Sequence, residues 1–153
     1  MITAWRIVPQ QWAGSAFDGE GARLYGGRWN SPGRPAVYLA DSRALAALEM
    51  LVHLNPAMAA LCYQMIEVSF PASLVQQIDI EPLGAALVSP SVSPATQNAG
   101  NAWLTEASAP VLQVYSSIIS EEPNYVLNPK HPKFDRLKIG EARAFAFDPR
   151  LVT

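Results

Sequence analysis

Residues 36–56 read AVYLADSRALAALEMLVHLNP, and in this stretch a strand pattern passes directly into a helix pattern. The apolar run AVYLA at its start predicts a short strand. Asp41 or Ser42 can cap the helix that follows, and the alanine and leucine content of that run gives it high helix propensity. We expect this helix to continue to about Leu54 and to end at Asn55-Pro56.

Outward from this unit, strand patterns outnumber helix patterns. Further strands are expected at residues 2–8, 62–70, 75–80, 110–116, 125–127 and 143–147, and a short helix around residues 95–104 lies within a loop-rich stretch. These strands do not alternate regularly with crossover helices, which argues against a parallel α/β sheet. The sequence therefore predicts an α+β fold in a single domain, residues 1–153, with a mixed or mostly antiparallel sheet core and few helices.

Length and composition limit the class of protein. A chain of 153 residues that is 50% hydrophobic can bury a core without disulfides. Cys62 is the only cysteine, so we expect neither a disulfide framework nor a metal site, and a reducing compartment fits best. The sequence shows no signal-peptide pattern and no apolar run of membrane length, which predicts a cytoplasmic protein that binds no membrane. The net charge of -2 gives no support to direct nucleic-acid binding.

A glycine-rich stretch precedes the expected strand at residues 36–40. Residues 16–30 read AFDGEGARLYGGRWN and join two expected strands. Glycines allow the backbone to approach a ligand closely, and the planar guanidinium groups of Arg23 and Arg28 suit a phosphate. We therefore expect a binding loop for a small ligand that carries phosphate.

Glu49 is the second candidate for a functional residue. The expected helix carries an apolar stripe formed by Leu45, Leu48 and Val52, and Glu49 falls within that stripe. A carboxylate in this position either points into a cleft where it does chemistry, or borders the apolar face and pairs with Arg43 or His53.

The combination of a carboxylate with arginines suits cleavage of an N-glycosidic bond. Positive charge develops on the sugar in this reaction, and a carboxylate nearby stabilises it. At about 4 Å and an effective dielectric of about 20 the attraction is roughly 4 kcal/mol, on the order of 10³ in rate when it acts chiefly in the transition state. An arginine would hold a diphosphate, and Tyr38 could stack on the departing ring. NAD has all of these parts, although the residues alone do not distinguish it from another nucleotide.

Five motifs, in order, carry a resemblance to a known family. They are residues 16–42 (AFDGEGARLYGGRWNSPGRPAVYLADS), then ALEMLVHL, VYSSII, NYVLNPKHPKF and FDPRL. The sequence resembles the RES domain, the toxin half of bacterial RES-Xre toxin–antitoxin pairs. The family name denotes an arginine, a glutamate and a serine, which fall on Arg28, Glu49 and Ser116. Tyr115 stands where the family commonly has proline, which leaves Ser117 as the alternative serine.

The resemblance implies a fold similar to ADP-ribosyltransferases and an activity that depletes NAD+. Some members hydrolyse it and others use inorganic phosphate as a co-substrate, and no further cofactor is implied. It also implies inhibition by an antitoxin with an Xre-like DNA-binding domain, and a homodimer within a larger toxin–antitoxin complex. The apolar stretch at residues 83–92 is a candidate interface.

The roles implied for the site residues follow the motifs. Arg28 would grip the diphosphate, with Arg6 or Arg23 assisting, and Tyr38 would stack on nicotinamide. Glu49 would orient the ribose and stabilise the cation. Ser116 would hydrogen-bond the ligand or hold Glu49. Asn128 is either a turn-forming residue or, through its place in the family motif, a ligand contact.

Two other functions fit the same residues. A mono-ADP-ribosyltransferase would place ADP-ribose on a protein, although the usual pair of acidic residues spaced by one is absent around Glu49. A non-catalytic nucleotide-binding module would use the same arginines. The histidines also have two interpretations each: His53 orients Glu49 or packs at the helix end, and His131 contacts phosphate or is an ordinary turn residue.

Overall fold

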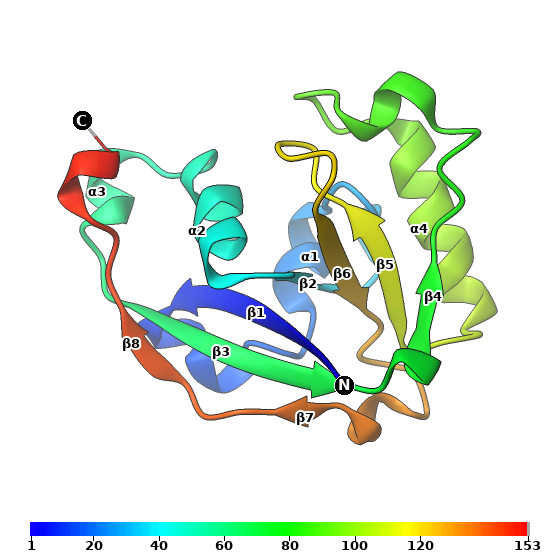
Figure 1. Ribbon diagram of the computed structural model, residues 1–153, viewed down its shortest axis with the longest axis horizontal. Coiled ribbons are helices and arrows are strands. Elements are labelled where there is room, and N and C mark those ends of the chain that lie inside the picture. The colour runs from blue at the N-terminus through cyan, green and yellow to red at the C-terminus, as the bar shows by residue number, and fades with distance from the viewer. Residues whose placement is uncertain (153) are drawn as a thin grey trace.

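A single strongly curled sheet organises the molecule. The computed structural model describes residues 1–152, and its strands follow the order β4-β5-β6-β2-β1-β3-β7, with β8 also paired to β3. Their bounds are β1 (Ile2–Pro9), β2 (Val37–Ala40), β3 (Tyr63–Phe70), β4 (Val75–Gln77), β5 (Val111–Tyr115), β6 (Pro123–Leu127), β7 (Lys138–Ile139) and β8 (Arg143–Phe145). Figure 1 shows β1 and β3 running across the view while β4, β5 and β6 run up it. Only β4 and β5 pair in parallel among the described strands, so the predicted mixed, mostly antiparallel sheet is confirmed.

The register of the central strands assigns residues to the two faces of the sheet. Ala40 lies opposite both Trp5 and Asn124, and Asn124 in turn lies opposite Val114. Directly opposed residues share a face, so these four lie on one side of the sheet. The helix α2 (Arg43–Leu51) packs on this side, and we call it the helix face.

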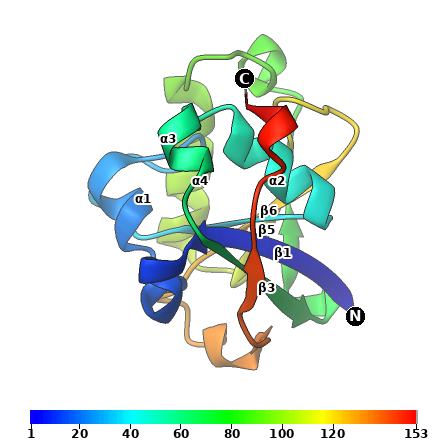
Figure 2. The same cartoon turned by 90° about the vertical axis from the view of Figure 1, so that its left-hand side faces the viewer.

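A separate cluster fills the opposite face. Its buried members include Ala4, Val37, Leu39, Val68 and Leu127, which alternate with the residues of the helix face along their strands. Figure 2, which views the molecule from the side of β8, shows α2 and α3 (Pro56–Ala59) above β1 and β3. The curled sheet is therefore packed on both sides.

The expected helix after β2 is confirmed, but its end differs from the prediction. Ser42 caps α2 by accepting a 3.0 Å hydrogen bond from the Leu45 amide. The helix ends at Leu51, before Asn55-Pro56. Asn55 instead caps α3 with a 2.8 Å bond from the Met58 amide. Proline has no amide proton, but the first turn of a helix does not use one there. Asn55-Pro56, which we expected to end α2, therefore begins α3.

Other differences from the sequence expectations are local. The glycine-rich stretch contains a short helix, α1 (Glu20–Tyr25), instead of a continuous loop. Strand β4 ends at Gln77, β8 ends at Phe145, and β7 has too few residues to give a sequence pattern. The helix expected around residues 95–104 is longer, α4 (Pro94–Glu106), because Ser93 caps it and Pro94 fits its first turn. No helix within residues 1–152 has the length and apolar character needed to span a membrane.

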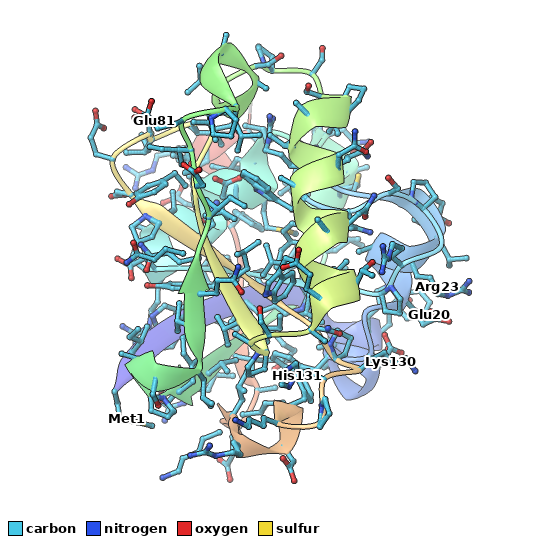
Figure 3. The ribbon with its side chains drawn as sticks, turned by 90° about the vertical axis from the view of Figure 1, so that its right-hand side faces the viewer. Met1, Glu20, Arg23, Glu81, Lys130 and His131 are labelled. Atoms are coloured by element: carbon cyan, nitrogen blue, oxygen red, sulfur yellow. The ribbon has the colours of Figure 1, made fainter. Side chains whose placement is uncertain are left out.

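The helix α4 lies directly on the backbone of the glycine-rich stretch. A Cβ atom on Gly100 would come within 1.7 Å of the Trp29 carbonyl oxygen, so only glycine permits this approach. Figure 3 shows α4 beside the segment that carries Glu20 and Arg23. This contact fixes the position of the turn that follows α1.

Candidate active site

Glu49 is held by two side chains from the far hairpin of the sheet. The Ser116 hydroxyl donates a 2.6 Å hydrogen bond to Oε1 of Glu49, and the Asn124 side-chain amide donates a 3.0 Å bond to the same oxygen. Ser116 follows β5 and Asn124 lies on β6, whereas Glu49 comes from α2. Two donors from the β5–β6 hairpin thus converge on one carboxylate oxygen of α2.

The hydrogen-bonding capacity of Ser116 is fully used. Its side chain is buried, and its oxygen accepts bonds of 3.0 Å from the amides of both Ile118 and Ile119. A hydroxyl has one proton to donate and two lone pairs to accept. Ser116 therefore acts as a fixed donor to Glu49.

The second carboxylate oxygen of Glu49, Oε2, has no hydrogen-bond partner among the described residues. Within residues 1–152 no hydrogen-bond donor reaches Oε2, and no Lys, Arg or His lies within ion-pair distance of the carboxylate. The expected alternative, in which Glu49 pairs with Arg43 or His53, is wrong. Arg43 instead stacks over the Trp5 ring, 3.8 Å from its centroid, and His53 is exposed. Glu49 is half-buried with one oxygen fixed and the other available.

Arg28 sits at the tip of a tight turn. The Gly27 amide donates a 2.9 Å bond to the Asn30 carbonyl, which places Arg28 and Trp29 between them. Asn30 is completely buried, and its amide group donates to the carbonyls of Ala22, Ser31 and Arg34. Gln97 of α4 adds 3.2 Å bonds to the carbonyls of Gly27 and Asn30. The turn is therefore a rigid support for Arg28.

Tyr38 connects this turn to the sheet. Its hydroxyl donates a 2.6 Å bond to Oδ1 of Asn30 and accepts a 3.0 Å bond from the Trp29 amide. Burial raises the pKa of the Tyr38 phenol well above its ordinary value, so the group stays protonated. Tyr38 precedes Ala40 by two positions on β2, which puts its side chain on the helix face with Asn124. Arg28, Tyr38, Asn124 and Glu49 thus follow one side of the sheet.

The Arg28 guanidinium is bound to backbone oxygens of a neighbouring segment. Residues 78–93 connect β4 to α4, and we call them the β4–α4 segment. Arg28 donates bonds of 3.4 Å to the Ala86 carbonyl and 2.8 Å to the Ser89 carbonyl. These partners are neutral, so the charge of Arg28 has no anion beside it within residues 1–152.

A hollow of about 200 Å³ adjoins the Glu49 site. It is lined by Ile80, Leu87 and Val88 of the β4–α4 segment together with Tyr115, Ser116 and Ser120. Pockets for small molecules usually measure about 300–1,000 Å³. The hollow would therefore hold only part of a nucleotide while the segment keeps this position. A second hollow, about 490 Å³, lies on the Arg43 side of α2. Its lining includes neither Arg28, Glu49 nor Ser116.

Comparison with known proteins identifies the family. Residues 3–148 match the RES domain. This chain belongs to the RES domain family. A Photorhabdus laumondii protein named Toxin Res is 34% identical over 149 residues, which cover 97% of this chain and 96% of that protein. A Sphingobium protein named Prs ADP-ribosylating toxin is 35% identical over 153 residues, which cover 97% of this chain and 95% of that protein.

A solved structure shares the fold. It is the crystal structure of the M. tuberculosis MbcT-MbcA toxin–antitoxin complex, in which one chain matches with a TM-score of 0.78 and 22% identity. The match covers 97% of this chain and 85% of that chain. The predicted α+β class of this RES domain is thereby confirmed.

Arg6 and Arg23 do not contact Glu49, Ser116 or Arg28. Arg6 follows Trp5 on β1 and so points to the face opposite the helix face, where it bonds the carbonyls of Ala16 (2.8 Å) and Tyr38 (3.1 Å). Burial lowers its pKa to about 10, with partial compensation by Asp18. Arg23 forms an ion pair with Glu20 on the surface of α1 (Figure 3). Both arginines therefore have structural partners in the RES domain.

Asn128 and His131 have hydrogen-bond partners other than the Glu49 carboxylate. Asn128 is buried at the end of β6, where its side-chain oxygen accepts a 3.0 Å bond from the Lys130 amide. His131 is also buried; Nε2 lies 2.8 Å from the Ala107 carbonyl, while Nδ1 accepts from the Lys133 amide. These contacts hold His131 within the turn that follows β6.

Sequence reasoning missed Asn124 and Asn30. Asn124 is the first residue of the quoted NYVLNPKHPKF motif and lies two positions before Val126 on β6, so both side chains are on the helix face. Nothing local marks Asn124 as a partner of Glu49. Asn30 ends the GGRWN string, and its complete burial is a tertiary effect of α4. A polar residue on a strand whose neighbours are apolar was the available signal for Asn124.

Proposed function

We propose that this RES domain is the toxin of a toxin–antitoxin pair and that it consumes NAD+ by cleaving the bond between nicotinamide and ribose. The observation that carries the proposal is Glu49, with Oε1 fixed by Ser116 and Asn124 and Oε2 left without a protein donor. The names of the Photorhabdus and Sphingobium relatives support a toxin, and ADP-ribosylation breaks the same bond.

In the proposed reaction Glu49 stabilises the ribose cation. The bond between C1 of the ribose and the ring nitrogen breaks, and its electron pair leaves with nicotinamide, which becomes neutral. The positive charge on the ribose then faces the free carboxylate oxygen of Glu49, and the attraction grows as the bond lengthens. Water attacks C1 and loses a proton to give ADP-ribose, or inorganic phosphate attacks to give ADP-ribose-1″-phosphate. Tyr38 would stack on the departing ring.

Arg28 would bind the diphosphate of NAD+. To do so it must exchange the neutral carbonyls of Ala86 and Ser89 for phosphate oxygens. Charge-assisted bonds from a guanidinium to phosphate are shorter and stronger than bonds to carbonyls, so the exchange is favourable. It would also release the β4–α4 segment and enlarge the hollow beside Ser116. Arg28 would therefore couple substrate binding to opening of the site.

The proposed partner is an antitoxin. The fold shared with a chain of the MbcT-MbcA complex supports such a partner. An Xre-like DNA-binding domain in the antitoxin, and a homodimer of the toxin within the complex, are the assembly that we propose from the family resemblance. Action in the cytoplasm belongs to the same proposal.

A second function uses the same site. The Sphingobium relative is named as an ADP-ribosylating toxin, which favours a mono-ADP-ribosyltransferase as the alternative. In that case a side chain of a target protein replaces water or phosphate as the nucleophile. The Glu49 and Arg28 geometry serves either acceptor.

The experiment is incubation of purified protein with NAD+, followed by phosphorus NMR with and without inorganic phosphate. We expect free nicotinamide together with either ADP-ribose or ADP-ribose-1″-phosphate. Glu49→Ala should abolish the release while the protein stays folded. Label transferred from NAD+ to a target protein, without bulk consumption, would instead establish the transferase. A protein that shifts in melting temperature with NAD+ but releases no nicotinamide would be a binding module and would overturn the proposal.

A further inference from the structure

Asn124 occupies a position that its strand neighbours do not explain. It lies on β6 opposite Ala40 and Val114, and the following residues Tyr125 and Val126 are buried and largely apolar. A polar amide at such a place needs hydrogen-bond partners, since buried polar groups without them are costly. The partner that the structure provides for its amide nitrogen is Oε1 of Glu49.

The other end of the same side chain has no partner. Oδ1 of Asn124 is shielded from solvent, and no donor reaches it within residues 1–152. Leaving an amide oxygen in this state costs folding free energy. A flipped amide would place the oxygen against the Glu49 carboxylate, where two acceptors repel, so the orientation is set by Glu49. The fold thus accepts an unsatisfied oxygen in order to present an N–H group to Glu49.

Both hydrogen-bond donors to Glu49 are uncharged groups. Ser116 and Asn124 are both neutral, and no cation lies within ion-pair distance among the described residues. A neutral donor fixes the position of a carboxylate without cancelling its charge. An arginine or lysine in the same place would offset the field that a developing cation experiences. Both donors reach Oε1, which leaves Oε2 without a protein donor among the described residues.

We propose that Asn124 is a positioning residue of the active site, which holds the Glu49 carboxylate in place through a neutral hydrogen bond at the expense of stability. This inference rests on the proposed function, because it gives Glu49 its role in nicotinamide release. Asn124 acts through Glu49 and has no chemical role of its own. Its contribution belongs to the transition state, since Glu49 is needed when charge develops on the ribose.

The test uses two substitutions of similar shape. Asn124→Leu removes both the donor and the unsatisfied oxygen, and Asn124→Asp replaces the donor with a like charge facing Glu49. We expect kcat for nicotinamide release to fall about 10- to 100-fold in the Leu variant, and further in the Asp variant, with little change in KM for NAD+. The melting temperature of the Leu variant should equal or exceed that of the wild type. Asn98→Leu, at an exposed position of α4, is the control and should keep its activity.

A structural role would give the opposite pattern. A Leu variant that loses activity and melting temperature together, or one that retains the wild-type kcat, overturns the proposal. Crystal structures of wild type and Asn124→Leu give a second readout that needs no turnover: the Glu49 carboxylate should leave Ser116 or adopt more than one rotamer in the variant. An unmoved carboxylate overturns the role of Asn124 even in a protein inactive on NAD+. Absence of nicotinamide release by the wild type overturns only the proposed function.

Discussion

The Ser116 hydroxyl donates a 2.6 Å hydrogen bond to Oε1 of Glu49 across a separation of 67 residues in the sequence. The same oxygen atom of Ser116 accepts from two backbone amides, so its proton can point only to Glu49. The loop after β5 therefore transmits its backbone geometry to the carboxylate on α2. Of the two roles that the family resemblance implies for Ser116, the hydrogen bond to Glu49 is the one present in this structure.

Replacement of Ser116 should therefore resemble loss of a support for Glu49. Ser116→Ala is expected to lower kcat for nicotinamide release about 10- to 100-fold with little change in KM. It should also cost about 1–3 kcal/mol of unfolding free energy, because two backbone amides lose their acceptor. Steady-state kinetics and urea denaturation measure the two effects. Ser117→Ala is the matched control, and equal losses in both variants would contradict the assignment to Ser116.

Two arginines of the glycine-rich stretch should behave differently. Arg28→Ala is expected to lower kcat/KM for NAD+ by about 10²-fold, since each bond from a charged donor contributes about 1.5–3 kcal/mol. Arg28→Lys should restore little, because an ammonium group cannot form the planar fork. Arg23→Ala removes only a surface ion pair with Glu20 and should leave the kinetics unchanged. A large loss in Arg23→Ala would show that α1 reaches the substrate.

The local elements of this fold could be predicted from the sequence because their signals are local. Apolar alternation gives β1 and β3, and Ser42 followed by a run of alanine and leucine gives α2. The boundary at Asn55-Pro56 could not be decided in this way, since the same dipeptide is compatible with the end of one helix and the beginning of another. Its role depends on where the chain goes next.

The candidate site also combines residues that local motifs predict with contacts that only the tertiary structure creates. Arg28, Glu49 and Ser116 could be named from motifs, but their partners are tertiary. No local pattern connects Asn124 with Glu49 or the Ala86 carbonyl with Arg28, because sheet register and the path of residues 78–93 create those contacts. The apolar composition of residues 83–92 indicated only a candidate interface.

Two helical glycines allow a test of how α4 supports the Arg28 turn. Gly100→Ala would push a methyl group into the Trp29 carbonyl, so we expect a loss of about 3 kcal/mol in unfolding free energy and lower kcat/KM. Gly21→Ala in α1 meets no atom within 4 Å and should stabilise the protein by up to about 1 kcal/mol. Denaturation curves of both variants check the contrast. A tolerated alanine at position 100 would mean that α4 does not rest on the turn.

The exchange proposed for Arg28 predicts faster hydrogen exchange in the β4–α4 segment when substrate binds. The amides of Ala86 and Val88 donate to the carbonyls of Leu83 and Ala85, and these bonds persist only while the segment keeps its turn. Arg28 fastens that turn through the Ala86 and Ser89 carbonyls. A diphosphate that takes the guanidinium removes this fastening, so both amides should exchange faster in Glu49→Gln with NAD+ bound, where turnover is blocked.

The matched experiment needs no ligand. Arg28→Ala alone should show the same acceleration at Ala86 and Val88, because the fastening is absent from the start, and NAD+ should add little to it. Amides in β1 serve as the internal reference, since they lie in the centre of the sheet and should exchange slowly throughout. Slower exchange at Ala86 and Val88 with NAD+ would mean that the segment closes over the substrate while Arg28 keeps its carbonyl partners. Such a result would separate substrate binding from release of the segment and contradict the coupling.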